Sequence, residues 1–262
     1  NTFDRVVINN FASLGGLTIG WYAGHLSGAT PVIQGNSNDI TISSVTSIAG
    51  PISFHGAAIT VSAALTCTDA NAAVLVKASG TATVSAGITT NAGAINIWAD
   101  SDSNGSGGIM VNNNTTFDSR TNADRLATTH TTGGGTITLA GGADDGGTAS
   151  GTSSLTTGMV ASDGIPDGYA VNSGSLAAQT GIVLGTSTAA TGQNANVNFY
   201  SGGGHMRLFG KVTNNASSPA SGPTGIQAFH GHTLNAGTNG DIIFIGNADL
   251  TSGLWAIGMD LA

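Results

Sequence analysis

The sequence predicts an all-β fold, a solenoid of short repeated strands joined by variable loops. Three observations support this. The acidic residues are all Asp, with no Glu and only six Lys and Arg; short segments alternate apolar and polar residues; and a glycine-containing frame recurs ahead of those segments. Ser, Thr, Asn and Asp favour turns and strands because they compete with the helical backbone for hydrogen bonds. We therefore expect almost no helix.

The composition is that of a chain that can bury a core. Charged residues make up 8% of the 262 residues, hydrophobic residues 40%, and there are 41 glycines. Disordered chains usually combine low hydrophobicity with high net charge, which is not the case here. We expect one solenoid domain over 1–262, a fragment or processed part of a longer chain. The first 34 residues fit the repeat least well, and 112–132 are expected to form a long insertion loop.

Short strands are predicted wherever apolar and polar residues alternate over about three to five positions. No segment keeps a helical period of 3.6 residues. The predicted strands are 17–19, 40–42, 52–54, 59–61, 74–76, 95–97, 109–111, 137–139, 197–199, 206–208 and 242–245.

A shared frame precedes many of these strands. It reads Gly-Gly-x-apolar-x-apolar at 132–141 and 201–210, and recurs more loosely at 91–99 and 239–246. Repetition of one unit indicates a repeat architecture, and no fixed hairpin turn separates the strands as a sandwich would require. A second element, Gly-apolar-x-apolar, follows at 108–111, 158–160, 181–184, 225–228 and 253–256.

Two of these frames carry a family resemblance. Gly-Gly-Gly-Thr-Ile-Thr-Leu-Ala-Gly-Gly and Ala-Gly-Ala-Ile-Asn-Ile-Trp-Ala-Asp resemble the strand repeats of giant bacterial surface proteins related to filamentous haemagglutinin. The resemblance covers most of 35–262. It implies a right-handed parallel β-helix with variable loops, export to the cell surface or medium, and a structural, adhesive or fibre-forming role. The chain is accordingly expected not to be an enzyme.

Charge and hydropathy limit the partners. The net charge is −8, and the basic residues are scattered apart from Arg120 and Arg125. Nucleic-acid binding needs a basic patch, so it is not expected. No run of about 18 apolar residues exists, so no membrane span is expected in this chain. The expected partners are a further copy, joined end to end, and a glycan or other surface partner.

One run predicts a metal site. Asp100, Asp102 and Asn104, followed by Gly105, form an Asp-x-Asp-x-Asn-Gly pattern that resembles the start of an EF-hand-type calcium loop. Val111 stands where that loop carries its bidentate Glu. The competing interpretation is an exposed polar turn. Calcium is the one cofactor the sequence suggests.

Two other functions stay open. A carbohydrate-active β-helix enzyme, of the polysaccharide lyase or hydrolase type, would need several Asp and a basic residue on one groove. The only mixed-charge cluster, Asp118, Arg120, Asp124 and Arg125, is interpreted as surface salt bridges. An ice-binding solenoid would need a flat face on which Thr-x-Thr motifs from successive rungs form regular rows. The segments 81–83 and 136–138 match that pattern, but most rungs do not.

Overall fold

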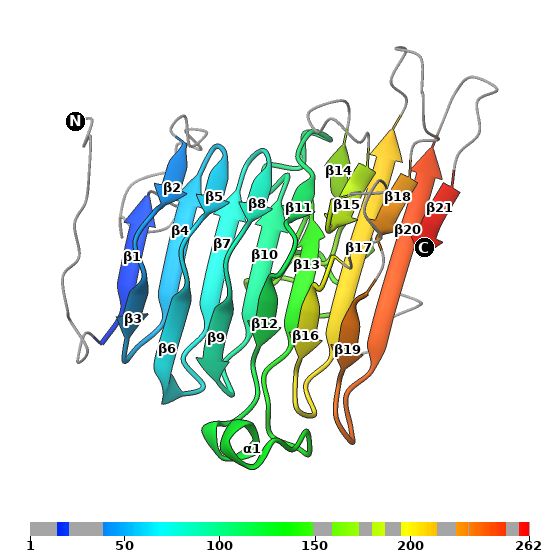
Figure 1. Cartoon of the computed structure of the whole chain (residues 1–262). Coiled ribbons are helices and arrows are strands. Elements are labelled where there is room, and N and C mark those ends of the chain that lie inside the picture. Colours follow the sequence, from blue (N-terminus) through cyan, green and yellow to red (C-terminus); the bar gives the residue numbers. More distant parts are fainter. Residues whose placement is uncertain are drawn as a thin grey trace.

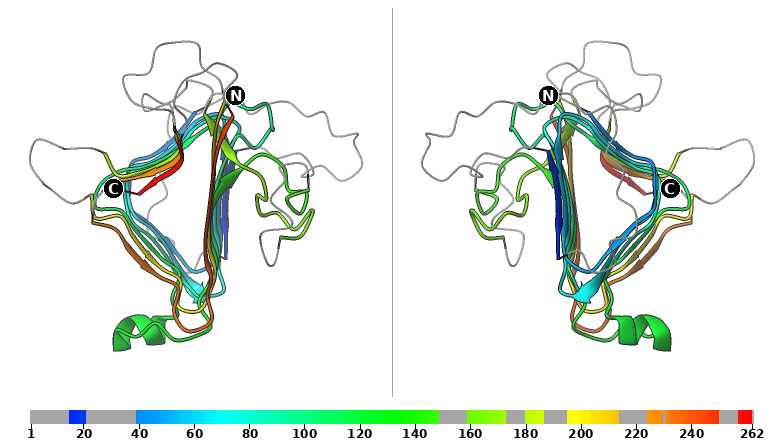
Figure 2. Two further views of the ribbon diagram at one scale, coloured as in Figure 1. Left: turned by 90° about the vertical axis from the view of Figure 1, so that its right-hand side faces the viewer. Right: turned by 90° about the vertical axis from the view of Figure 1, so that its left-hand side faces the viewer.

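The computed structural model describes residues 15–20, 39–148, 159–172, 180–186, 195–213, 224–229, 231–249 and 257–261. These residues form a three-sided prism of parallel sheets, with loops leaving its corners (Figures 1 and 2).

Each side of the prism is one parallel sheet. Sheet A contains β1 (Leu17–Gly20), β4 (Ile52–Gly56), β7 (Val74–Ala78), β10 (Ile95–Ala99), β13 (Ile137–Gly141), β14 (Ala170–Asn172), β17 (Met206–Thr213) and β20 (Ile242–Asp249). Sheet B contains β2 (Ile40–Ile42), β5 (Ile59–Val61), β8 (Ala82–Val84), β11 (Ile109–Val111), β15 (Thr180–Leu184), β18 (Thr224–Ala228) and β21 (Ile257–Leu261). Sheet C contains β3 (Thr46–Ile48), β6 (Leu65–Ala70), β9 (Ile88–Asn91), β12 (Thr116–Asp118), β16 (Asn198–Tyr200) and β19 (Thr233–Asn235).

The chain visits sheets A, B and C in turn, so three successive strands make one rung, except where β13 and β14 both lie in sheet A. Each rung stacks on the one before it, and equivalent strands pair in parallel. This arrangement confirms the predicted parallel β-solenoid. The extent of the domain over 1–262 stays a prediction.

Apolar residues alternate with polar residues along each strand, and the apolar ones form the core. In sheet A one inward column is formed by Ile52, Val74, Ile95, Ile137 and Met206, all fully buried. In sheet C the rings of Phe117 and Phe199 stack inside the prism with centroids 4.9 Å apart. Burying one such side chain stabilises the fold by about 1.5–3 kcal/mol. The apolar-x-apolar pattern therefore fixes which side of every strand faces inward.

A column of small residues explains the glycine frame. Two positions before the first core residue of each sheet A strand, the rungs approach closely at the corner between sheets C and A. A Cβ added to Gly93, Gly135 or Gly204 would overlap the backbone carbonyl of the rung beneath. Glycine, which has no side chain, fits at these three positions, while the equivalent position before β7 carries Ala72, the smallest residue with a side chain. The recurring glycine is thus a stacking requirement.

The predicted strands of sheets A and B are confirmed, whereas most of sheet C was not foreseen. Its strands β3, β9, β12 and β19 are short and rich in Thr, Ser and Asn. The range 112–132, expected as an insertion loop, contains β12 as well as a helix. Within 158–160, Met159 and Val160 are not in a strand, and Val160 is exposed. The range 253–256 lies outside the described residues.

Candidate functional site

A dense cluster of charged side chains lies where an insertion leaves the solenoid between β12 and β13. The insertion, 119–136, carries helix α1 (Asn122–Ala127). Thr121 Oγ1 caps the helix by accepting a hydrogen bond from Asp124 N at 3.0 Å, and Thr128 ends it in the left-handed conformation. A capping threonine and an acidic first turn are local helix signals, which explains a six-residue helix in this β-rich chain.

Asp118, at the end of β12, holds two arginines. Its Oδ2 lies 2.7 Å from Arg120 Nη2 and 3.0 Å from Arg125 Nε, and its Oδ1 accepts a hydrogen bond from Arg120 Nε at 3.0 Å. Burial alone would raise the pKa of Asp118. The hydrogen bonds from Arg120 and Arg125 outweigh burial and hold that pKa below its ordinary value. We call Asp118, Arg120 and Arg125 the α1 clamp.

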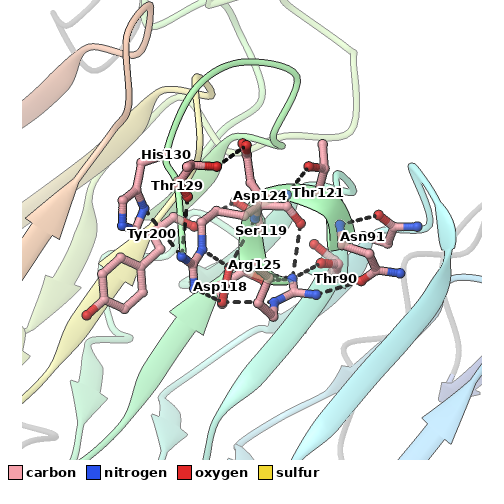
Figure 3. A network of polar contacts seen from close by, with 12 residues as sticks. Thr90, Asn91, Asp118, Ser119, Thr121, Asp124, Arg125, Thr129, His130 and Tyr200 are labelled. Atoms are coloured by element: carbon pink, nitrogen blue, oxygen red, sulfur yellow. Dashed lines mark hydrogen bonds and ion pairs between the residues drawn. The ribbon is translucent and has the colours of Figure 1, made fainter. Parts of the chain in front are cut away.

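Arg125 ties the helix to the neighbouring rung. Its Nη2 donates to the carbonyl oxygen of Thr90 in β9 at 2.6 Å, and its Nη1 donates to Asn122 Oδ1 at 2.6 Å. Asn122 N in turn donates to Asn91 Oδ1 at 2.9 Å. Figure 3 shows Arg125, Asp118 and Thr90 within this network. The base of the insertion is therefore fastened to two adjacent rungs.

The far side of the insertion is fastened as well. Asp124 Oδ1 accepts hydrogen bonds from the hydroxyls of Thr129 and Thr131, each at 2.8 Å. The rings of His130 and Tyr200 stack with centroids 5.3 Å apart, and Arg120 Cζ lies 4.8 Å from the Tyr200 centroid. Tyr200 belongs to β16, the next strand of sheet C.

The exposed part of the insertion presents little charge. Asp124 is buried, and the Arg120 and Arg125 side chains are only 12% and 26% exposed, so the charges of the insertion face its base. Leu126, in contrast, is 88% exposed. The sequence predicted surface salt bridges here. The salt bridges are present between Asp118 and the two arginines, but they are not fully on the surface: Asp118 and Asp124 are buried, and the arginines are partly exposed.

The predicted calcium residues share one turn after β10. Asp100 is buried and adopts a left-handed φ of 49°. Its Oδ1 accepts hydrogen bonds from Gly105 N at 3.0 Å and Ser106 N at 3.3 Å, while Asp102 Oδ2 accepts one from Asn104 Nδ2 at 2.8 Å. Burial raises the pKa of Asp100 to about 6, although backbone N–H groups oppose the rise. The structure brings the three residues together, and the calcium site stays a prediction.

Trp98 faces outward from sheet A, next to Lys77 on the neighbouring strand β7. It is nevertheless buried: Lys77 Nζ lies 3.6 Å from a ring centroid, and Trp98 Nε1 donates to the carbonyl oxygen of Gly142 at 3.0 Å. The ring is therefore occupied by protein contacts and does not offer an open stacking surface for a sugar.

Sheet B presents a hydroxyl array that the Thr-x-Thr search missed. In three consecutive rungs the outward positions carry Thr-x-Ser pairs. These are Thr41 and Ser43, Thr60 and Ser62, and Thr83 and Ser85. The next rung has Met110 in the threonine position, where the array ends. A search for Thr-x-Ser at the repeat spacing would have found it.

Comparison of the chain with protein-family models, curated proteins and solved structures gives no significant match. Among the described residues, no helix has the length and apolar character needed to cross a membrane, and no group of three or more His, Cys, Asp or Glu has an arrangement suited to a metal ion.

Proposed function

We propose that this chain is a structural and adhesive module of a bacterial surface or secreted protein, and that the insertion carrying α1 is its contact element. The α1 clamp is the observation that carries this proposal. Asp118 and the two arginines fasten the insertion to two rungs of a stiff solenoid, and Leu126 stands exposed beyond them. A preorganised projection loses little conformational freedom on binding, which favours contact with a partner.

The solenoid supplies the stiffness that such a module needs. Parallel ladders run along all three sides, and the apolar columns inside are continuous from rung to rung. End-to-end association fits the same role. Among the described residues, β20 pairs only with β17, and Ile242 at its start is 47% exposed. Unpaired strand edges are templates for further strands.

The adhesive role is tested by pulling beads coated with the chain from a methyl-terminated surface, the probe that suits an apolar tip. Leu126→Ser should lower the detachment force several-fold. Val45→Ser is the matched control because Val45 is also an exposed apolar residue, at 71%, but lies outside the insertion. Equal forces for both variants and the wild type would contradict the role given to α1.

The carbohydrate-active enzyme is the competing proposal. The carboxylate of Asp118 is engaged by two arginines, and that of Asp100 by backbone N–H groups, so both have structural partners. We expect no release of reducing or unsaturated sugar ends from an anionic polysaccharide. If sugar ends are released, and if Asp118→Asn abolishes that release while keeping its fold, the result would favour the enzyme.

Ice binding is a second candidate function, favoured by the hydroxyl array of sheet B. Neighbouring parallel strands lie about 4.8 Å apart, so Thr41, Thr60 and Thr83 form a regular uncharged row. Thr60→Tyr would disrupt the middle of the row, whereas Thr66→Tyr on sheet C would not. Ice shaping by the wild type and by Thr66→Tyr, but not by Thr60→Tyr, is the expected result. Absence of ice shaping by the wild type would exclude it.

A further inference from the structure

The chain makes an excursion from sheet A between β13 and β14. β17 pairs with β13 through Met206–Leu208 and with β14 through Gly210–Val212, so β14 resumes the sheet where β13 stopped. The base of the excursion is closed by a hydrogen bond from Gly141 N to the carbonyl oxygen of Gly168 at 3.2 Å. We call its described parts, 142–148 and 159–169, the flap. Compact loops with closed ends frequently carry function.

The flap covers the outer face of sheet A. Tyr169 and Met159 pack against Ala140 and Phe209, which point away from the prism and are nevertheless fully buried. Ile243 and Ile245 of β20 extend this second apolar cluster. Figure 2 shows the loops of this region, in green and yellow-green, lying outside the sheet. Opening the flap would therefore expose an apolar patch on the side of the rod.

Two carboxylates fasten the two arms of the flap together. Asp144, on the first arm, accepts hydrogen bonds from Gly164 N at 2.7 Å and from Asp163 N at 3.2 Å on the second arm. In the other direction, Asp167 Oδ2 accepts one from Gly146 N at 2.8 Å. These contacts hold the flap closed.

The same contacts crowd negative charge. Asp144, Asp145, Asp163 and Asp167 share the two arms, and the cations facing them are Arg207 of β17 and Lys77 of β7. Asp167 is 1% exposed. Burial raises its pKa to about 6, with Asp163 and Asp144 adding to the rise and Arg207 and the Gly146 N–H opposing it. Closing the flap around an ionised Asp167 therefore carries an electrostatic cost, because it buries that charge and brings it close to Asp163 and Asp144.

We propose that the flap is an acid-tightened cover, whose opening is controlled by the charge of Asp167, which is buried between the two arms and lies close to the other carboxylates of the flap. Protonation of Asp167 removes one charge while its side chain stays in place, so the closed form is favoured as the pH falls. In the open flap Asp167 regains an ordinary pKa of 3.8. The stabilisation of the closed form is then complete below about pH 4 and is lost as the pH rises through about 6. The proposal does not depend on the adhesive role of α1.

Hydrogen exchange at single amides tests this in the presence of a chelator, which removes any divalent cation. After correction for intrinsic exchange rates, protection of Gly146 N and Gly164 N should be about tenfold higher at about pH 5 than at about pH 7.5. Asp167→Asn, which mimics the protonated acid, should give high protection at both pH values. Asp69→Asn, a change at an exposed acid of β6, should keep the wild-type response.

Amides of the buried strand β10 serve as the internal reference, because a change there would report global unfolding. Protection of the flap that is independent of pH in the wild type would overturn the proposal. So would an unchanged pH response in Asp167→Asn.

Discussion

Gly135 lies directly over Gly93 at the corner between sheets C and A. A Cβ on Gly135 would overlap the carbonyl oxygen of Gly93, and Gly204 has the same relationship to Gly135 one rung further along. The spacing between rungs is set by backbone hydrogen bonds, so this overlap cannot be relieved by moving one side chain.

Gly135→Ala should therefore destabilise the solenoid. We expect a loss of about 1–3 kcal/mol in the free energy of unfolding, measured by urea denaturation. Gly87→Ala is the control: the nearest atom to its added Cβ would be Thr116 O at 3.5 Å, an ordinary contact. That variant should be unchanged or more stable by about 0.4–1 kcal/mol, through the lower entropy of the unfolded chain. Equal losses for both variants would show that the corner column does not limit stacking.

The α1 clamp should contribute to stability in a pH-dependent way. Asp118→Asn leaves Arg120 and Arg125 without their shared carboxylate, and should lower the free energy of unfolding by about 1.5–3 kcal/mol at neutral pH. Because the pKa of Asp118 is held below its ordinary value in the folded state, this contribution is present above about pH 4 and is lost in stronger acid. Urea denaturation at about pH 7 and about pH 3 checks this. Asp69→Asn is the control. If Asp118→Asn is as stable as Asp69→Asn at neutral pH, the α1 clamp does not contribute to stability.

His55 should make the protein less stable as the pH falls. Burial, with a smaller effect of Lys77, lowers the pKa of His55 to about 4 from 6.5. Its contribution is therefore present above about pH 6.5 and is lost as the pH falls through about 4. Between about pH 7 and about pH 4.5, the free energy of unfolding of the wild type should fall by about 1–2 kcal/mol more than that of His55→Gln. Asp100 and Asp167 act in the opposite direction, so only the difference between wild type and variant isolates His55. If the difference in free energy of unfolding between the wild type and His55→Gln stays constant with pH, His55 is not the group responsible.

The turn that begins at Asp100 should be stable without a metal. Asp100→Ala leaves Gly105 N and Ser106 N without their acceptor, and should cost about 1–3 kcal/mol with a chelator present. Asp102→Ala, at an exposed position, should cost much less. We expect thermal melts of the wild type to coincide in calcium and in chelator. A midpoint that rises with calcium, and stops rising in Asp102→Ala, would instead support the calcium site predicted from sequence.

The sequence predicts the repeat well and the sites poorly, for a physical reason. Core columns such as Ile95 and Ile97 recur in every rung, so each repeat reinforces the pattern. Sheet C is harder to recognise because its strands are rich in polar residues, as in Ile-Thr-Thr-Asn of β9 and Thr-Leu-Asn of β19. The contacts of the α1 clamp join Thr90, Asp118 and Arg125, and depend on which rungs are neighbours. The spacing of these residues in the sequence does not show which rungs are neighbours, so these contacts become visible only in the three-dimensional structure.

The exposed end of sheet A gives the last prediction. The outer edge of β20 has no partner strand among the described residues. The side chains of Phe244 in β20 and of Met259 in β21, the neighbouring strand of sheet B, pack against the core but are only partly buried. Association of copies through this end would bury them, so the sedimentation coefficient should rise with protein concentration. Ile242→Lys places a charge on that edge and should keep the chain monomeric. Leu126→Lys is the matched control, since it adds the same charge to an exposed residue on the side of the rod. If Leu126→Lys alone prevents association, the copies meet through α1 and the rod does not lengthen end to end.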